Sequence, residues 1–186
     1  QDRLDFLRGV RTNEAGGSGT NAFRKRGSVL GDIVNSGVAF SGAPVQRYAD
    51  QSSFVSTYAD RKKALFVGAN DGMFHAFDSA TGAELFAYIP RFLVPKLPAL
   101  TSTSYKHQSY ADGTPVVADA KVGSTWKTVL VAGAGGGGQG VFALDVSRPE
   151  SFTASNVMWE FTDRDDPAMG NVIGRPQILK FRVTAP

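Results

Sequence analysis

The sequence contains no cysteine, which excludes disulfide cross-links, cysteine-ligated zinc sites and thiol nucleophiles. It also lacks any apolar run near the ~20 residues that a helix needs to cross a bilayer. The first residues, QDRLDF, do not show the basic-then-apolar pattern of a signal peptide, so we expect that any targeting peptide has been removed or lies upstream. With 42% hydrophobic and 20% charged residues, the composition is that of a globular chain.

The chain also lacks a large excess of positive or negative charge. Twenty basic residues face seventeen acidic ones, for a net charge of +3. The two basic clusters, Arg24–Arg26 and Arg61–Lys63, are short, distant in sequence and free of interleaved aromatic residues. Such clusters are more typical of solvated faces than of a nucleic-acid site, so we expect no nucleic-acid partner.

Three short segments recur in the same order along the chain. The run LFVGA at 65–69 returns as LVAGA at 130–134, HAFD at 75–78 as FALD at 142–145, and LFAY at 85–88 as MWEF at 158–161. The offsets are 65, 67 and 73 residues. Because the segments are short, rich in β-branched and aromatic residues and bounded by turn-forming residues, we interpret them as strands of two homologous units.

The residues between these segments predict turns that join antiparallel neighbours. Asn70-Asp71-Gly72 can supply the positive φ angles of a tight hairpin. After the next strand, Asp78 is suited to accept a hydrogen bond from its own backbone and Gly82 to adopt a left-handed conformation.

A fourth strand is predicted before each set of three, at Val38–Val45 and Pro115–Val122, and Pro176–Val183 opens a further unit. Four short antiparallel strands repeated in this order are typical of β-propeller blades. His75 and Phe77 point to one face of their strand and Phe74 and Ala76 to the other, so neither face is polar, as blades covered on both sides require. The sequence therefore predicts an all-β fold, a partial β-propeller of about two four-stranded antiparallel blades plus the start of a third.

We predict one lead-in segment and one partial propeller. The lead-in segment, partly helical or irregular, spans residues 1–30, and the propeller spans 31–186, with blade one at 31–90, an inserted loop at 91–113, blade two at 114–162 and the start of blade three at 174–186. The inserted loop is the first place to look for binding residues, because long loops on a rigid scaffold tend to carry them. Its candidates are Tyr105, His107, Tyr110 and Asp112.

The two histidines invite different interpretations. His75 occupies the repeat position that Phe142 fills in the second unit, which predicts a core residue in an apolar site between blades. His107 lies in the inserted loop with two tyrosines nearby. Because no second histidine is near it, we favour a loop-anchoring role for His107 over metal binding or catalysis.

Two motifs could form a ligand site, but the residues around them do not support one. Residues 133–138, GAGGGG, satisfy G-x-G-x-x-G after a strand, but a strand rather than a helix follows and no Gly-Lys-Ser/Thr occurs, which favours a glycine-rich hairpin loop over a nucleotide site. Asp163, Asp165 and Asp166 could offer oxygen ligands to calcium. Their spacing lacks the D-x-D-x-D-G pattern, so we favour a solvated acidic turn over a metal site. No serine lies in a nucleophile-elbow context, and we predict no catalytic residue.

Several motifs in fixed order resemble a known family. The run at 65–78, ending in TGAEL at 81–85, resembles a quinoprotein-type propeller blade. Around it lie RGSVLGDIVNS at 26–36, AYIP at 87–90, YKH at 105–107, DGTP at 112–115, WKTVLV at 126–131, GVFALDV at 140–146 and WEF at 159–161. Together they span nearly the whole chain and resemble the N-terminal part of the C-terminal β-propeller of the PilY/PilC type IV pilus tip-associated adhesins.

This resemblance implies a non-enzymatic scaffold and adhesin module that promotes pilus assembly, opposes retraction and attaches to host cells or abiotic surfaces. It implies minor pilins or other pilus components as partners and an extracytoplasmic location at the pilus tip, cell surface or outer membrane. The calcium loops of the family are not found in this stretch, so we expect no cofactor here and place calcium, if anywhere, elsewhere in the full-length protein. Arg8-Gly9-Val10 also lacks the aspartate of the Arg-Gly-Asp tripeptide that some members carry.

Two alternatives stay open on the sequence. The blade-like repeat also resembles that of pyrroloquinoline-quinone-dependent dehydrogenases, although these generally need a complete ring, a calcium ion and often a vicinal cysteine pair. An envelope assembly scaffold unrelated to pili would fit the repeat equally well.

Overall fold

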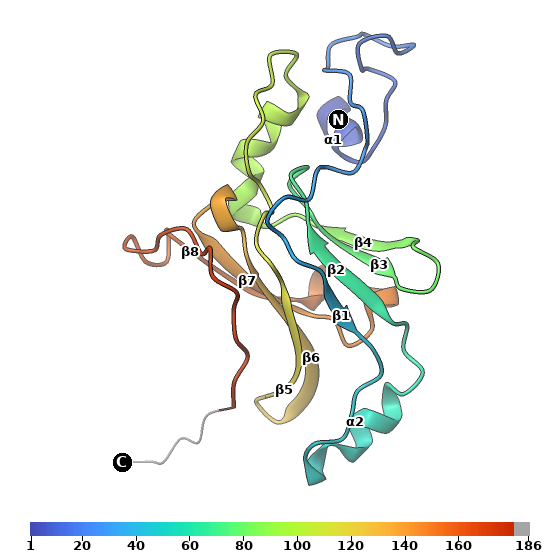
Figure 1. Cartoon of the computed structure of the whole chain (residues 1–186), viewed down its shortest axis with the longest axis vertical. Coiled ribbons are helices and arrows are strands. Elements are labelled where there is room, and N and C mark those ends of the chain that lie inside the picture. The colour runs from blue at the N-terminus through green and yellow to red at the C-terminus, as the bar shows by residue number, and fades with distance from the viewer. Residues whose placement is uncertain (181–186) are drawn as a thin grey trace.

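The computed structural model describes residues 1–180, which form two twisted antiparallel sheets packed against each other (Figure 1). The strands are β1 (Ala39–Ser41), β2 (Ala64–Gly68), β3 (Phe74–Asp78), β4 (Glu84–Tyr88), β5 (Val116–Val122), β6 (Thr125–Gly133), β7 (Gly140–Asp145) and β8 (Val157–Thr162). The helices are α1 (Asp2–Leu7) and α2 (Ser52–Thr57), with 3-10 helices η1 (Ala49–Gln51), η2 (Arg91–Thr101), η3 (Gly135–Gly137), η4 (Pro149–Ser151) and η5 (Ala154–Asn156). No helix among these residues is both long and apolar enough to cross a membrane.

Each sheet is a meander whose strands are neighbours in chain order. Blade one is β1-β2-β3-β4 and blade two is β5-β6-β7-β8, with every pair antiparallel. The third strand of each blade carries a register shift against the fourth, between Ala76 and Phe77 in blade one and between Ala143 and Leu144 in blade two. These shifts fall on residues that the internal repeat makes equivalent. The predicted two-blade partial propeller is confirmed.

The turns form at the predicted residues, but in the first turn only Gly72, and not Asn70 or Asp71, has a positive φ angle. Gly72 and Gly82 adopt φ angles of 96° and 72°, in the left-handed region that glycine reaches at little cost. The carboxylate of Asp78 accepts a hydrogen bond from the backbone N–H of Ala80 at 2.9 Å. Between β6 and β7 the glycine-rich run forms η3, one short 3-10 turn without the following helix that a dinucleotide site would need.

Three segments differ from the expected pattern. β1 covers only three of the residues predicted as the strand Val38–Val45. Residues 176–180 carry no strand, and residues 181–183 of the predicted strand Pro176–Val183 lie outside the described residues. The inserted loop begins with the eleven residues of η2, where leucines at intervals of three or four turn inward despite two internal prolines. A 3-10 helix can form here because proline's fixed φ is compatible with it.

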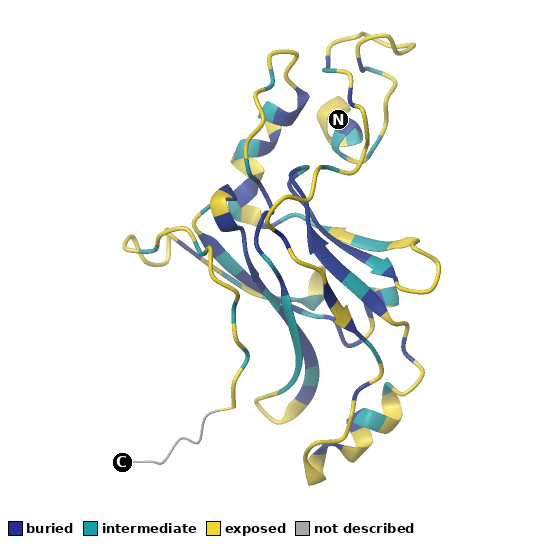
Figure 2. Ribbon diagram, in the orientation of Figure 1, coloured by how far each residue is buried: buried dark blue, intermediate teal, exposed yellow. Residues whose placement is uncertain are grey.

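Aromatic side chains fill the junction between the two blades. Figure 2 shows that the strands of both blades contain many buried residues. The ring of Phe142, which is fully buried, meets Phe74 edge-on at 4.8 Å between centroids and Tyr88 at 5.0 Å. Phe86 stacks on Phe152 at 3.8 Å. Each such ring buries a large apolar area, so this junction is the main source of stability that the two blades share.

A buried arginine crosses the same junction. Arg61, just before β2, donates a hydrogen bond from Nε to the carbonyl oxygen of Gly42 at 2.7 Å and contacts the hydroxyl of Thr128 in β6. The carboxylate of Asp119 in β5 lies 3.9 Å from its guanidinium. Burial lowers the pKa of Arg61, and Asp119 opposes that change. The expectation that Arg61 belongs to a solvated face is therefore wrong, because hydrogen-bond partners far away in sequence satisfy the buried cation.

His75 is also placed differently from the expectation. It lies on the face of blade one that points away from blade two, and its ring nitrogens contact two carboxylates, Nδ1 to Glu84 at 2.6 Å and Nε2 to Asp71 at 3.1 Å. Although burial disfavours the imidazolium, these two acids raise the pKa of His75 above its ordinary value. The prediction of an apolar site is wrong: the register matches Phe142, but carboxylates from the neighbouring turn and strand surround the ring.

Candidate functional site

The rim insertion, residues 91–113, leaves blade one after β4, extends beyond the end of the sheets and returns to β5 (Figure 1). The lead-in segment, residues 1–30, lies at the same end of the molecule, whereas α2 lies at the opposite end. The candidates Tyr105, His107, Tyr110 and Asp112 all belong to this insertion, and the structure divides them into two pairs.

Tyr110 and Asp112 anchor the base of the insertion. Asp112 is 3% exposed and accepts hydrogen bonds from the backbone N–H of Asn35 at 2.9 Å, from the Asn35 side chain at 2.6 Å and from the hydroxyl of Ser109 at 3.1 Å. Tyr110 is fully buried, and its backbone N–H donates to the side chain of Asn70 at 2.9 Å. Because Tyr110 and Asp112 are buried, they hold the loop in place and are not available to a partner. Of the four candidates, Tyr105 and His107 remain as residues that could contact a partner.

Close backbone packing completes this base. A Cβ added to Gly137 would overlap the carbonyl oxygen of Tyr110, and one added to Gly113 would overlap the carbonyl oxygen of Gly133. The glycine-rich run thus serves to let the insertion and the β6–β7 connection approach each other. Lys96 joins the two from one side, donating to the carbonyl oxygens of Ser109 at 3.1 Å and Gly137 at 2.5 Å.

The tip of the insertion, residues 102–109, is largely exposed (Figure 2). It borders a shallow hollow of about 310 Å³ lined by Ala99, Ser102, Ser104, Tyr105, Lys106, His107 and Gln108. The side chain of His107 is 58% exposed, and its Nε2 lies 2.8 Å from the carboxylate of Asp32. Partial burial disfavours the charged form of Asp32, but hydrogen bonds from Asn70 and His107 outweigh this and lower its pKa.

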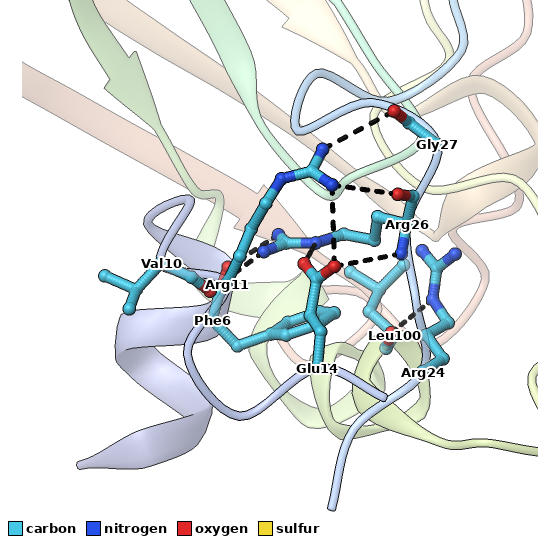
Figure 3. A network of polar contacts seen from close by, with 8 residues as sticks. All are labelled: Phe6, Val10, Arg11, Glu14, Arg24, Arg26, Gly27 and Leu100. Carbon is cyan, nitrogen blue, oxygen red and sulfur yellow. Dashed lines mark hydrogen bonds and ion pairs between the residues drawn. The ribbon is translucent and has the colours of Figure 1, made fainter. Parts of the chain in front are cut away.

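A buried ion pair holds the lead-in segment together internally (Figure 3). Nε of Arg26 donates to the carboxylate of Glu14 at 2.6 Å, and both side chains are almost fully buried. The remaining donors of Arg26 reach the carbonyl oxygens of Phe6 at 2.6 Å and Val10 at 3.1 Å. Arg26, expected on a solvated face, is therefore a structural residue; breaking a buried pair of this kind costs several kcal/mol because a charge is left unpaired.

Arg24 connects the lead-in segment to the insertion. Its Nε donates to the carbonyl oxygen of Leu100 at 2.7 Å, and its guanidinium lies 4.4 Å from the centroid of the Tyr105 ring (Figure 3 shows the first contact). A cavity of about 140 Å³ lies behind this pair, also bordered by His107 and Asp32. The sequence did not identify Arg24 as a site residue, because it shows Arg24 only as part of a short basic cluster. Its contact with Tyr105 joins two segments that are far apart in sequence.

Hydrogen bonds between its own residues stabilise the acidic turn after β8. The carboxylate of Asp165 accepts hydrogen bonds from the N–H of Thr162 at 2.8 Å and from its hydroxyl at 3.1 Å, and that of Asp166 accepts one from the N–H of Ala168 at 2.9 Å. Within residues 1–180, no group of three or more histidines or acids is arranged to hold a metal ion, so Asp163, Asp165 and Asp166 do not gather into such a group.

Comparison with known proteins decides the family. A sequence model of the PilY1 beta-propeller domain matches residues 30–183. This chain belongs to the PilY1 β-propeller domain family. The resemblance to the PilY/PilC propeller, drawn from motifs spread over the chain, is thus confirmed.

Curated relatives in the family are type IV pilus biogenesis factors. The chain is 40% identical to PilY1 of Pseudomonas aeruginosa strain PAK, over 97% of this chain and 16% of that protein. It is 38% identical to a PilY1 homolog of Xylella fastidiosa, over 96% of this chain and 13% of that protein. The chain thus spans less than a fifth of the length of these relatives.

A solved structure shows the same fold. The crystal structure of the Pseudomonas aeruginosa PilY1 C-terminal domain superimposes with a TM-score of 0.55 at 38% identity, covering 68% of this chain and 24% of that one. The two blades therefore correspond to part of a larger family domain.

Proposed function

We propose that this chain is a non-enzymatic β-propeller module of the type IV pilus machinery that promotes pilus assembly and attachment to surfaces. The observation that carries the proposal is membership in the PilY1 β-propeller family, whose relatives are named type IV pilus biogenesis factors. Minor pilins or other pilus components are the proposed partners, and host cells or abiotic surfaces the proposed targets. The proposed location is extracytoplasmic, at the pilus tip, the cell surface or the outer membrane.

The anchored insertion is the part of this chain best suited to recognition. Hydrogen bonds tie its base to Asn35 and Asn70 of blade one and to the carbonyl oxygens of Ala134 and Gly137 in blade two, while its tip is exposed. A rigid base limits the conformational entropy that a loop loses on binding, and this favours a tip that meets its partner in one arrangement.

Deletion of the gene in the source organism tests the proposal. We expect fewer surface pili, reduced twitching motility and weaker attachment, all restored by the intact gene, and recovery of minor pilins with the affinity-purified protein. Unchanged piliation, motility and attachment would overturn the proposal. Tight binding of pyrroloquinoline quinone to the full-length protein would revive the dehydrogenase alternative instead.

A further inference from the structure

The positive charge of the chain is concentrated at the end that carries the rim insertion. The lead-in segment and the rim insertion hold nine lysines and arginines against four acids, whereas the rest of the chain holds eleven against thirteen. Glu14 and Asp112 among these acids and Arg26 among these cations are buried in internal contacts, which leaves eight cations against Asp2 and Asp5. Asp32, outside both segments, adds one carboxylate at this end, where it lies against His107. A surface with excess charge of one sign attracts ligands of the opposite sign, so this end favours an anionic partner.

The hollow at the tip offers polar groups of several kinds. Ser102, Ser104 and Tyr105 bring hydroxyls, Gln108 an amide and Lys106 an exposed ammonium. The ring of Tyr105 is held from one side by the guanidinium of Arg24. Hydroxyl, amide and ammonium groups around an aromatic ring match a sugar chain that carries acid groups, because its hydroxyls both donate and accept hydrogen bonds and its carboxylates or sulfates pair with the cations.

Other classes of ligand fit this surface less well. Single-stranded nucleic acid needs successive aromatic platforms, but the tip presents one half-buried tyrosine. Protein interfaces and membrane surfaces need apolar anchors, and residues 102–109 contain no aliphatic side chain.

We propose that the tip of the rim insertion, with Tyr105 and Lys106 at its centre and Arg24 behind them, binds an acidic polysaccharide. The inference rests on the proposed function in that it names the ligand class of the attachment module, but the binding itself can be measured without pili.

The test uses the purified full-length protein and three probes: hyaluronate as an acidic polysaccharide, dextran as a neutral one and duplex DNA as a polyanion of another class. We expect saturable binding to hyaluronate that weakens as salt is added, with dextran and DNA binding at least about tenfold more weakly. Lys106→Ala should weaken hyaluronate binding about two- to fivefold, as expected for loss of one exposed ion pair, and Lys106→Arg should restore most of it.

Lys63→Ala is the matched control, because Lys63 is also an exposed lysine and lies just before β2, outside the insertion and the lead-in segment. It should change the affinity less than twofold. Absence of saturable hyaluronate binding, equal effects of Lys106→Ala and Lys63→Ala, or tighter binding of DNA would each overturn the proposal. Polysaccharide binding is measured on the purified protein and piliation on cells, so a protein that supports piliation but does not bind hyaluronate would overturn this inference alone.

Discussion

The junction between the blades and the base of the rim insertion are both buried, but different kinds of groups fill them. Apart from Arg61 and its partners, apolar side chains such as those of Phe74, Phe142 and Leu144 fill the junction. At the base, the carboxylate of Asp112 and the backbone of Gly137 meet particular atoms of neighbouring segments. Apolar packing depends mainly on the volume of the side chains and tolerates substitution by other apolar residues of similar size. The base depends on individual hydrogen bonds and on glycines, which have no side chain to keep the segments apart.

Phe142→Ala tests the junction and should have the largest effect. Removal of a fully buried ring that contacts blade one should lower the free energy of unfolding by about 3–5 kcal/mol, measured by chemical denaturation. Phe40→Ala is the control, because Phe40 is 58% exposed, and it should cost less than about 1 kcal/mol. Similar losses for the two variants would show that the junction is not the stabilising contact.

Gly137→Ala tests the base of the insertion. The new methyl group would overlap the carbonyl oxygen of Tyr110, so the backbone must shift at a cost of about 1–3 kcal/mol. A Cβ at Gly27 would meet no atom within 4 Å, and Gly27→Ala should therefore be nearly neutral. An equally mild effect at Gly137 would contradict close backbone packing at the base.

Tyr88→Phe tests a polar contact at the edge of the apolar junction. The hydroxyl of Tyr88 donates to the carboxylate of Glu160 in blade two, and burial together with this carboxylate raises the pKa of Tyr88. Loss of the hydroxyl should cost about 1 kcal/mol, because Glu160 keeps its hydrogen bond from the N–H of Arg91. Tyr48→Phe is the control, because Tyr48 is 40% exposed, and it should leave the midpoint of denaturation unchanged.

His75→Phe tests how far the two blades are interchangeable, since it installs the residue of the equivalent position, and its effect should be the smallest. His75 has a pKa raised above its ordinary value of 6.5, so its stabilising contribution is full below that value and is lost as the pH rises through the raised pKa. Denaturation between about pH 6 and about pH 9 should show falling stability in the parent and a flatter profile in the variant. Identical slopes would exclude His75 as the titrating group.

Much of the blade framework can be predicted from the sequence. Strands β2, β3, β6 and β7 are short apolar runs between strong turn residues, and their repetition identifies a blade without knowledge of distant contacts. Gly82 takes the left-handed conformation that its place in the turn predicts. These features depend on neighbours in the chain, which a single sequence contains.

The misassigned residues depend on partners in other turns, strands and segments of the chain. Arg26 and Arg61 look like solvated charges, but carbonyl oxygens and acids of other segments satisfy them in the interior. His75 matches Phe142 in register, yet the neighbouring Asp71 and Glu84 change its surroundings. No periodicity or motif marks such partners.

In the candidate site, too, the sequence predicts some features and the three-dimensional structure alone shows others. Residue type and position in a long insertion point to Tyr105 and His107, but they point equally to Tyr110 and Asp112, which the fold buries. Only the three-dimensional arrangement separates the anchoring pair from the exposed one and brings Arg24 to Tyr105.

Amide hydrogen exchange on the full-length protein tests most directly whether a fixed base presents an exposed tip. The N–H of Tyr110 donates to the side chain of Asn70, and that of Asp112 donates to the carbonyl oxygen of Ala134. The protection factors of these two N–H groups should lie within about tenfold of those measured in β6 and β7. Residues 103–108 should exchange far faster. If Tyr110 and Asp112 exchanged as fast as the tip, the insertion would not be anchored, and the account would be contradicted.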